Sequence, residues 1–217
     1  MILHYSPGAV SMAAHILLRE LGLDFELRAY PTGDDAHLTP AYLALNPMGR
    51  VPTLEVDGRT LTEMPAILIH LGRGTAWLPT EGWARARCDE LLSQIASLAH
   101  PPYRMAMRPD RILGPSGDEA AQRAVREAGR REFLRVIQII DGQLPETGPA
   151  VGLNRSVADP YLAVIWLWVR YLGESTRPYP RLSRIAVEML RRPAAQHVMV
   201  AEGLVDAEGQ PTPPTRV

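Results

Sequence analysis

The chain has 217 residues, of which 46% are hydrophobic and 22% are charged, and its formal net charge is −1. This length accommodates one large domain or two small ones, and the composition is that of an ordinary globular protein. A nearly neutral chain lacks the clustered basic charge that nucleic-acid binding requires, although all 23 of its basic residues are arginines.

The single cysteine, Cys88, restricts the chemistry further. One cysteine excludes an internal disulfide framework, a Cys-x-x-Cys redox site and a cysteine-based zinc cluster, so we expect no metal and a small buried side chain here. The N-terminal stretch Met1–Tyr5 lacks the basic region and apolar core of a signal peptide. The longest apolar run, Tyr161–Val169, is too short to span a membrane. We therefore expect a cytoplasmic protein with neither membrane nor nucleic acid as a partner.

The N-terminal residues predict alternating strands and helices. Met1–Tyr5 is expected to form a buried strand, and the hydroxyl of Ser11 can cap a helix that ends at Gly22. Phe25–Tyr30 alternates as a second strand does, and Thr39-Pro40 is typical of a helix start, here opening a short helix to Leu45. A right-handed crossover makes the two strands parallel.

A hairpin and a third helix complete this half. Thr53–Val56 is expected to pair with the returning strand at Arg59–Leu61 through the two-residue turn Asp57-Gly58. Thr62 can cap the following helix, whose apolar residues share one face. The order βαβαββα predicts an α/β thioredoxin-like domain with a mixed four-stranded sheet, here without redox cysteines.

A linker rich in glycine, proline and threonine, Gly72–Trp83, divides the chain. We predict a thioredoxin-like domain at residues 1–75 and an all-helical domain at residues 84–217. In the first helix of the latter, Leu98 is expected on the apolar face with Leu91, Leu92 and Ile95, and His100-Pro101-Pro102 is expected to kink or end it.

Further helices follow by pattern. Asp118–Leu144 predicts a long, arginine-rich amphipathic helix. Ser156–Asp159 is a capping box in front of the most apolar helix, Tyr161–Leu172, which should lie at the centre of the helical domain. Pro180–Leu190 predicts another helix, and an irregular tail is expected from Gly203 onward.

Three short motifs carry a family resemblance: Asn46-Pro47, then Gly49-Arg50-Val51-Pro52, then Thr62-Glu63 at a helix start. Together they resemble the glutathione S-transferase family, especially its bacterial beta-like members. The resemblance implies that glutathione is the co-substrate and that the Val51-Pro52 bond is cis, which lets an extended peptide add as a strand. It also implies that the glutathione-binding residues are Arg50, Val51, Pro52, Glu63 and Met64.

The zwitterionic γ-glutamyl end of glutathione would then meet the start of the third helix. Glu63 suits the ammonium group, and the backbone N–H of Met64 suits the γ-glutamyl carboxylate. Relatives commonly have serine where this chain has Met64, so a hydrogen bond to a charged group, worth about 1.5–3 kcal/mol, is missing. Serine at position 64 is expected to tighten glutathione binding if the side chain faces glutathione, and to reduce stability if it packs in the core.

A transferase must also hold the glutathione sulfur as thiolate. Lowering a thiol pKa by two units requires about 2.7 kcal/mol of preferential stabilisation. We expect Ser11 to be the main donor and Tyr5 the second, although Ser11 is equally well explained as a plain helix cap and Tyr5 as a core residue. Val10 occupies the place of the family's cysteine, which excludes mixed-disulfide chemistry there.

The second substrate would be a small apolar electrophile held between the domains. The resemblance implies an electrophile site formed by Val10, His100, Tyr103, Arg104 and Trp168, and ordinary helix packing is the alternative for each. The expected function is that of a cytosolic glutathione S-transferase, a homodimer through its third and fourth helices. Two alternatives are a non-catalytic binding protein with weakened glutathione affinity and a glutathione-dependent isomerase or dehalogenase.

Overall fold

The computed structural model describes residues 1–31, 33, 35–114 and 117–205. The N-terminal half has the predicted element order with one added 3-10 turn, in the sequence β1 (Ile2–Tyr5), α1 (Met12–Glu20), β2 (Glu26–Ala29), η1 (Ala36–Leu38), α2 (Pro40–Leu45), β3 (Thr53–Val56), β4 (Arg59–Thr62) and α3 (Met64–Gly72).

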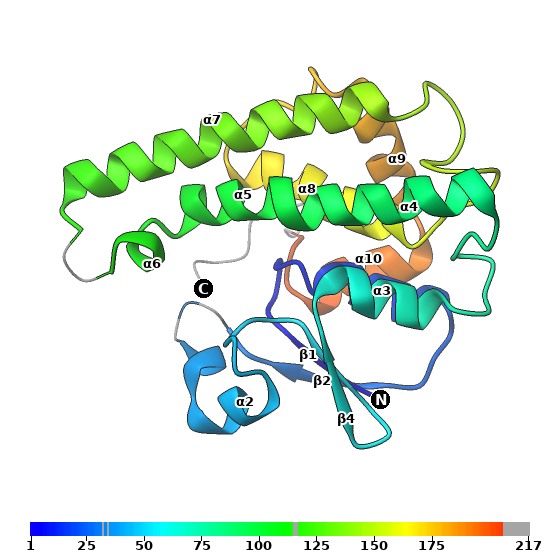
Figure 1. The fold of residues 1–217 in the computed structure, drawn as a ribbon, viewed down its shortest axis with the longest axis horizontal. Helices are drawn as coiled ribbons and strands as arrows, with labels where there is room; N and C mark the ends of the chain where they lie inside the picture. Colours follow the sequence, from blue (N-terminus) through cyan, green and yellow to red (C-terminus); the bar gives the residue numbers. More distant parts are fainter. Residues whose placement is uncertain (32, 34, 115–116, 206–217) are drawn as a thin grey trace.

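These strands form one mixed sheet in the order β2-β1-β3-β4. β1 pairs with β2 in parallel and with β3 in antiparallel, as the crossover and hairpin predict. Val56 pairs with Arg59 across the predicted two-residue turn, in which Asp57 and Gly58 both have positive φ. The N-terminal half is therefore thioredoxin-like, and α3 lies between the sheet and the helical part (Figure 1).

The C-terminal half is helical throughout. Its elements are α4 (Gly82–Gln94), the π turn η2 (Ile95–Ala99), α5 (His100–Met107), α6 (Asp110–Leu113), α7 (Glu119–Gln143), α8 (Ala158–Tyr171), α9 (Pro180–Leu190) and α10 (Pro193–Ala201). α4, η2 and α5 run on as one rod beside α7 (Figure 1). The domain boundaries, with a linker between α3 and α4, stay a proposal. In the described part of the chain, no helix combines the length and apolar character that crossing a membrane requires.

The π turn corrects two expectations about this rod. His100-Pro101-Pro102 does not end the helix, because both prolines stand in the first turn of α5, where a missing N–H is tolerated. Leu98 is 52% exposed rather than on the buried face, since the extra residue of a π turn shifts the later side chains of the rod around its axis.

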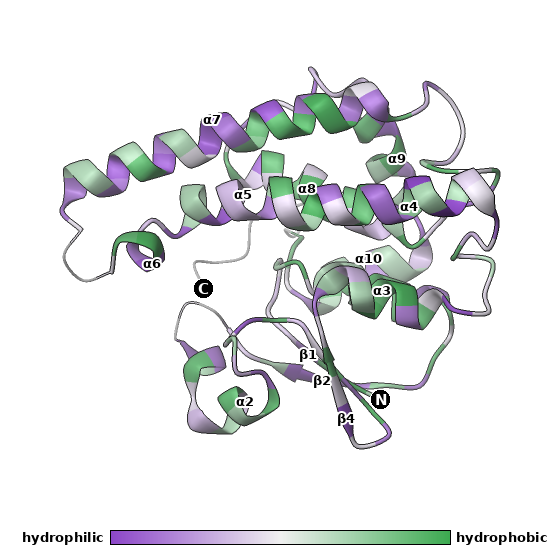
Figure 2. Ribbon diagram, viewed as in Figure 1, coloured by the Kyte–Doolittle hydropathy of each residue, from purple (hydrophilic) through white to green (hydrophobic). Residues whose placement is uncertain are grey.

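Local capping signals located the starts of α7 and α8, whereas the short helix α6 was not predicted. Asp118 accepts a hydrogen bond from the Ala121 N–H at 2.7 Å and begins α7, whose hydrophobic and hydrophilic patches alternate along its length (Figure 2). Asp159 accepts from the N–H and hydroxyl of Ser156, at 2.8 and 2.9 Å, which is one half of the predicted capping box, and α8 begins at Ala158, earlier than the predicted Tyr161. Cys88 is fully buried, and burial raises its pKa to about 11.

One close approach requires a glycine. At Gly129 of α7 a Cβ would lie 2.6 Å from the Pro102 carbonyl oxygen and 2.7 Å from the Ala106 nitrogen, both in α5. One side of α5 therefore packs closely against α7. The opposite side of α5 faces away from α7.

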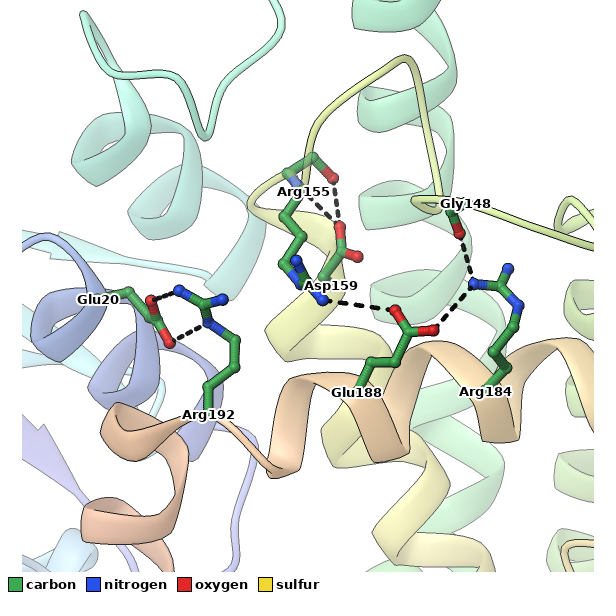
Figure 3. A network of polar contacts seen from close by, with 8 residues as sticks. Glu20, Gly148, Arg155, Asp159, Arg184, Glu188 and Arg192 are labelled. Atoms are coloured by element: carbon green, nitrogen blue, oxygen red, sulfur yellow. Dashed lines mark hydrogen bonds and ion pairs between the residues drawn. The ribbon is translucent and has the colours of Figure 1, made fainter.

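The two halves share a continuous apolar core, in which α1 packs against both α8 and α10. Glu20 at the end of α1 forms a bidentate ion pair with Arg192 at the start of α10, with both N···O distances 2.6 Å (Figure 3). Helix α10 was not predicted; it begins at Pro193, inside a segment whose apolar pattern is short. The predicted tail falls on residues 203–217, and residues 206–217 lie outside the described part.

Candidate active site

Three strand ends meet at one edge of the sheet. In the β1–β3 pair His4 stands opposite Thr53, and in the β3–β4 pair Thr53 stands opposite Thr62. The residues that follow or precede these positions, namely Tyr5, Pro52 and Glu63, therefore lie side by side. The motifs that the sequence singled out, although up to sixty residues apart, converge here.

The loop between α2 and β3 is held rigidly at this edge. The carbonyl oxygen of Arg50 accepts hydrogen bonds from the Tyr42 hydroxyl and the Asn46 side-chain amide, both at 2.6 Å. Gly49 has φ +55°, and a Cβ there would lie 2.8 Å from a methyl group of Leu38. Tyr42, which sequence reasoning missed, is as important for this loop as the predicted Asn-Pro motif.

The Val51-Pro52 bond is cis, as predicted. The loop residue Val51 precedes β3, and in the part of the chain that the structure describes its N–H and C=O make no hydrogen bond. Both groups lie beside the sheet without a partner strand. An extended peptide laid along this edge can therefore pair with them.

The start of α3 supplies polar groups next to Val51. Glu63, not Thr62, is the N-cap of this helix, because Thr62 is the last residue of β4. Glu63 is exposed and holds φ +67°, a backbone conformation that non-glycine residues rarely adopt and that is typical of functional positions. Pro65 has no N–H, so Met64 and Ala66 bear the unpaired N–H groups of the first turn. The Met64 side chain, 3% exposed, belongs to the hydrophobic core.

The loop between β1 and α1 contains the predicted thiolate donor. The Ser11 hydroxyl is fully buried, donates to the Ser6 carbonyl oxygen at 3.1 Å and accepts from the Ser6 N–H at 3.2 Å. It therefore closes the loop and does not cap α1. Val10 is 4% exposed and packs in the core. In the described part of the chain the N–H groups of Val10 and Ser11, although buried, make no hydrogen bond, and the start of a helix is where such groups favour an anion.

Tyr5 lies beside this loop at the end of β1. It is half-buried, and its hydroxyl has no hydrogen-bond partner among the described residues. Burial, and then the charge of Glu202, raise the pKa of Tyr5, which keeps the phenol protonated at neutral pH. A protonated phenol is a donor. This geometry favours Tyr5, with the two backbone N–H groups, over Ser11 as the thiolate donor.

We predict that Tyr5→Phe raises the pKa of bound glutathione by about one unit, because one hydrogen bond to a charged group is lost. Ser11→Ala should leave that pKa unchanged and lower the stability of the protein, since it opens the Ser6–Ser11 loop. The pH titration of the thiolate absorbance of the bound glutathione measures both. If the pKa of bound glutathione rose in Ser11→Ala and not in Tyr5→Phe, Ser11 would be the thiolate donor.

Aromatic side chains of the helical half cover the loop. The Trp168 indole Nε1 donates to the Gly8 carbonyl oxygen at 3.2 Å. Tyr103 stacks on Trp168 with ring centroids 4.1 Å apart and planes within 1°, and the His100 ring lies 5.0 Å from the same indole. Arg104 is one turn after His100 on α5. The structure therefore brings together the predicted His100, Tyr103 and Trp168, next to the predicted thiol position.

His100 is neutral in this setting. Burial, and then the charges of Arg50 and Arg104, lower the pKa of His100 to about 4. The unfolded chain takes up a proton near pH 6.5, whereas the folded chain does so only near pH 4. Between these values the unfolded state binds more protons, so stability falls as the pH falls.

We therefore predict that acidification from about pH 6.5 to pH 4 destabilises the wild type more than His100→Gln. Urea unfolding across this range measures the difference. Parallel stability–pH curves for the two proteins would contradict the neutral, buried state of His100.

A buried carboxylate that sequence reasoning missed fixes the same loop from α10. Glu202 accepts from the Gly8 N–H at 2.9 Å and pairs with His15 Nδ1 at 2.8 Å. The side chains of Glu202 and His15 are both fully buried. Burial raises the pKa of Glu202, and the hydrogen bond from His15 opposes this. No local signal points to the contact, because 187 residues separate its partners.

Within the described residues, no three histidine, cysteine or acidic side chains gather as a metal site would require. The groups that converge are a phenol, unpaired backbone N–H and C=O groups, and a carboxylate. They suit a zwitterionic thiol peptide laid along the sheet edge.

Residues 8–73 match the family model described as the glutathione S-transferase N-terminal domain. The chain is 31% identical over 216 residues to glutathione S-transferase GstA of Escherichia coli O157:H7, covering 94% of this chain and 100% of GstA.

Two solved structures are similar as well. A sphingomonad glutathione S-transferase complexed with glutathione has a TM-score of 0.78 and 33% identity, over 94% of this chain and 100% of that one. A maleylacetoacetate isomerase from Methylobacterium extorquens AM1, solved with bound malonate and GSH, has a TM-score of 0.80 and 26% identity. The match covers 91% of this chain and 95% of that one.

Proposed function

Because this chain belongs to the glutathione S-transferase family, we propose that it is an enzyme that transfers glutathione to an electrophile. Glutathione lies along the sheet edge, with its backbone paired to Val51 and its γ-glutamyl end at Glu63 and the first N–H groups of α3. The observation that carries the proposal is the unpaired backbone of Val51, next to the free helix N-terminus.

The chemistry of the site is thiolate formation and attack. The N–H groups of Val10 and Ser11 and the Tyr5 hydroxyl stabilise the sulfur anion, while Arg50 lies at the other end of the peptide. His100 and Tyr103 form the largely apolar surface against which an electrophile rests, and Trp168, only 1% exposed and stacked under Tyr103, supports them from the core instead of meeting the electrophile as the sequence predicted. No metal takes part in this scheme.

A glutathione-dependent isomerase is the second candidate. The similar isomerase from Methylobacterium extorquens AM1, which holds malonate and GSH, is the observation that favours it. The third candidate, a non-catalytic binding protein, is suggested by Val10 and Met64, which stand where relatives have cysteine and serine.

We also propose a cytoplasmic homodimer. A single buried cysteine fits a reducing compartment. The exposed Leu98, in the π turn η2 that follows α4, supports an interface along α3 and α4. Light scattering of the purified chain tests the dimer.

A conjugation assay separates the three functions. We expect the wild type to couple glutathione to chlorodinitrobenzene well above the rate in buffer. Glutathione binding without conjugation or isomerisation would support the binding protein, and cis–trans isomerisation of an unsaturated dicarboxylate without conjugation would support the isomerase.

A further inference from the structure

The surface beside the proposed thiol position is cationic. Arg50 stands in the rigid loop next to Val51, and Gly49 before it packs against Leu38 and the His37 carbonyl. On the opposite side Arg111 of α6 reaches the same segment, donating to His37 and forming an ion pair with Asp35. Helix α6 thus contacts the segment at residues 35–38, beside which the loop that carries Arg50 lies.

Arg104 stands in the middle of this surface. It is half-buried on α5, four residues after His100, so the two side chains share one helix face. Burial, followed by the charges of Arg50, Arg111 and Arg108, lowers the pKa of Arg104. The surrounding field is therefore positive, and a bound anion would relieve the repulsion.

The nearby carboxylates are already engaged elsewhere. Asp110 pairs with Arg108 at 2.9 Å, and Asp35 pairs with Arg111. Among the residues that the structure describes, neither Arg104 nor Arg50 forms an ion pair with a carboxylate, although the charge of Asp110 partly offsets the repulsion at Arg104. A planar guanidinium with unused donors is the group that recognises a carboxylate in two-point fashion.

The position of Arg104 relative to the sulfur decides which carboxylate it binds. His100 contacts Trp168, and Trp168 donates to Gly8 in the loop proposed to hold the sulfur, so Arg104 lies one helical turn along α5 from the residue that adjoins this loop. Arg50, by contrast, directly precedes Val51, whose backbone is proposed to pair with glutathione, so Arg50 lies nearer than Arg104 to the glutathione backbone. Resting on the proposed function, we infer that the second substrate is an anionic electrophile, a flat molecule whose carboxylate is bound by Arg104. This replaces the apolar electrophile that the sequence predicts.

A matched pair of substrates tests this. Chlorodinitrobenzoate and chlorodinitrobenzamide with the same ring substitution differ only in charge at one position. In both, the glutathione sulfur forms a bond to the ring carbon that bears chlorine, chloride leaves with the bonding electrons, and the thiol proton passes to water. The ratio of kcat/KM values, each divided by its uncatalysed rate constant, isolates recognition of the carboxylate.

We expect the wild type to prefer the benzoate by about tenfold to a hundredfold, the range of one charge-assisted hydrogen-bond pair. Arg104→Gln should bring the ratio to about one, and Arg104→Lys, which keeps the charge without the planar fork, should retain part of it. Arg123→Gln, an exposed arginine of α7, is the matched control and should keep the wild-type ratio.

Three outcomes overturn the inference. The first is a wild-type ratio near one, and the second is a ratio that survives in a folded Arg104→Gln protein. The third is an equal loss with both substrates together with weaker calorimetric binding of glutathione, which would assign Arg104 to the carboxylate of glutathione itself. Turnover of neither substrate by the wild type would instead contradict the proposed function.

Discussion

Glu202→Ala is expected to reduce the free energy of unfolding by about 2–6 kcal/mol, since it leaves two buried hydrogen-bonding groups without their partner. The substitution removes the carboxylate to which the Gly8 N–H and His15 Nδ1 bind, in a buried site that water does not reach. Each orphaned buried group alone costs about 1–3 kcal/mol. Chemical denaturation of the variant measures the loss.

The same change should weaken glutathione binding. Gly8 lies in the loop between β1 and α1, and both its N–H and its carbonyl are held by the helical half, through Glu202 and Trp168. Releasing one of them lets the N–H groups of Val10 and Ser11 move out of alignment.

The matched control is Glu188→Ala. Glu188 pairs with Arg155 and Arg184 at 3.4 and 3.7 Å on the surface of α9 (Figure 3). An exposed pair of this kind contributes less than about 1 kcal/mol. Equal, small losses in both variants would mean that Glu202 does not hold the two halves together.

Met64→Ser should destabilise the protein by about 2–5 kcal/mol. The thioether is buried in the core, so serine leaves a cavity and adds a hydroxyl without a partner. No gain in glutathione affinity is expected, because only the backbone of residue 64 faces the proposed γ-glutamyl site.

Met64→Leu is the control, since a swap that nearly conserves volume costs less than about 1.5 kcal/mol. Thermal unfolding and calorimetric titration of both variants decide the matter. A Met64→Ser protein as stable as the wild type and with tighter glutathione binding would place the side chain at the ligand rather than in the core.

The parts of this fold that local chemistry determines were predictable. The Asp57-Gly58 turn, the Asp118 cap and the Ser156–Asp159 box each depend on residues within four positions of one another, so their patterns predict structure directly. The family motif likewise located the loop that holds Val51.

Features that depend on distant partners were not predictable. Ser11 has the pattern of a cap, but its hydroxyl turns back to Ser6 because Ser6 offers both a donor and an acceptor in a buried loop. The π turn before His100 changes which side of the rod Leu98 occupies, and no residue pattern in the sequence predicts this π turn. The Glu202–His15 pair and the Arg50–Arg104 surface arise only when the two halves meet.

Glutathione binding at the sheet edge is tested most directly by thermal unfolding with added ligand. Cysteinylglycine is the matched control ligand, because it has the thiol but lacks the γ-glutamyl group that Glu63 and the start of α3 would hold. Binding to the native state stabilises it by RT ln(1 + [L]/Kd), about 2.7 kcal/mol at a hundredfold excess over Kd. We predict that glutathione raises the unfolding temperature in a saturable manner and that cysteinylglycine does so far less. An unfolding temperature that stays unchanged in about 10 mM glutathione, or that rises equally with both ligands, would contradict binding at this edge.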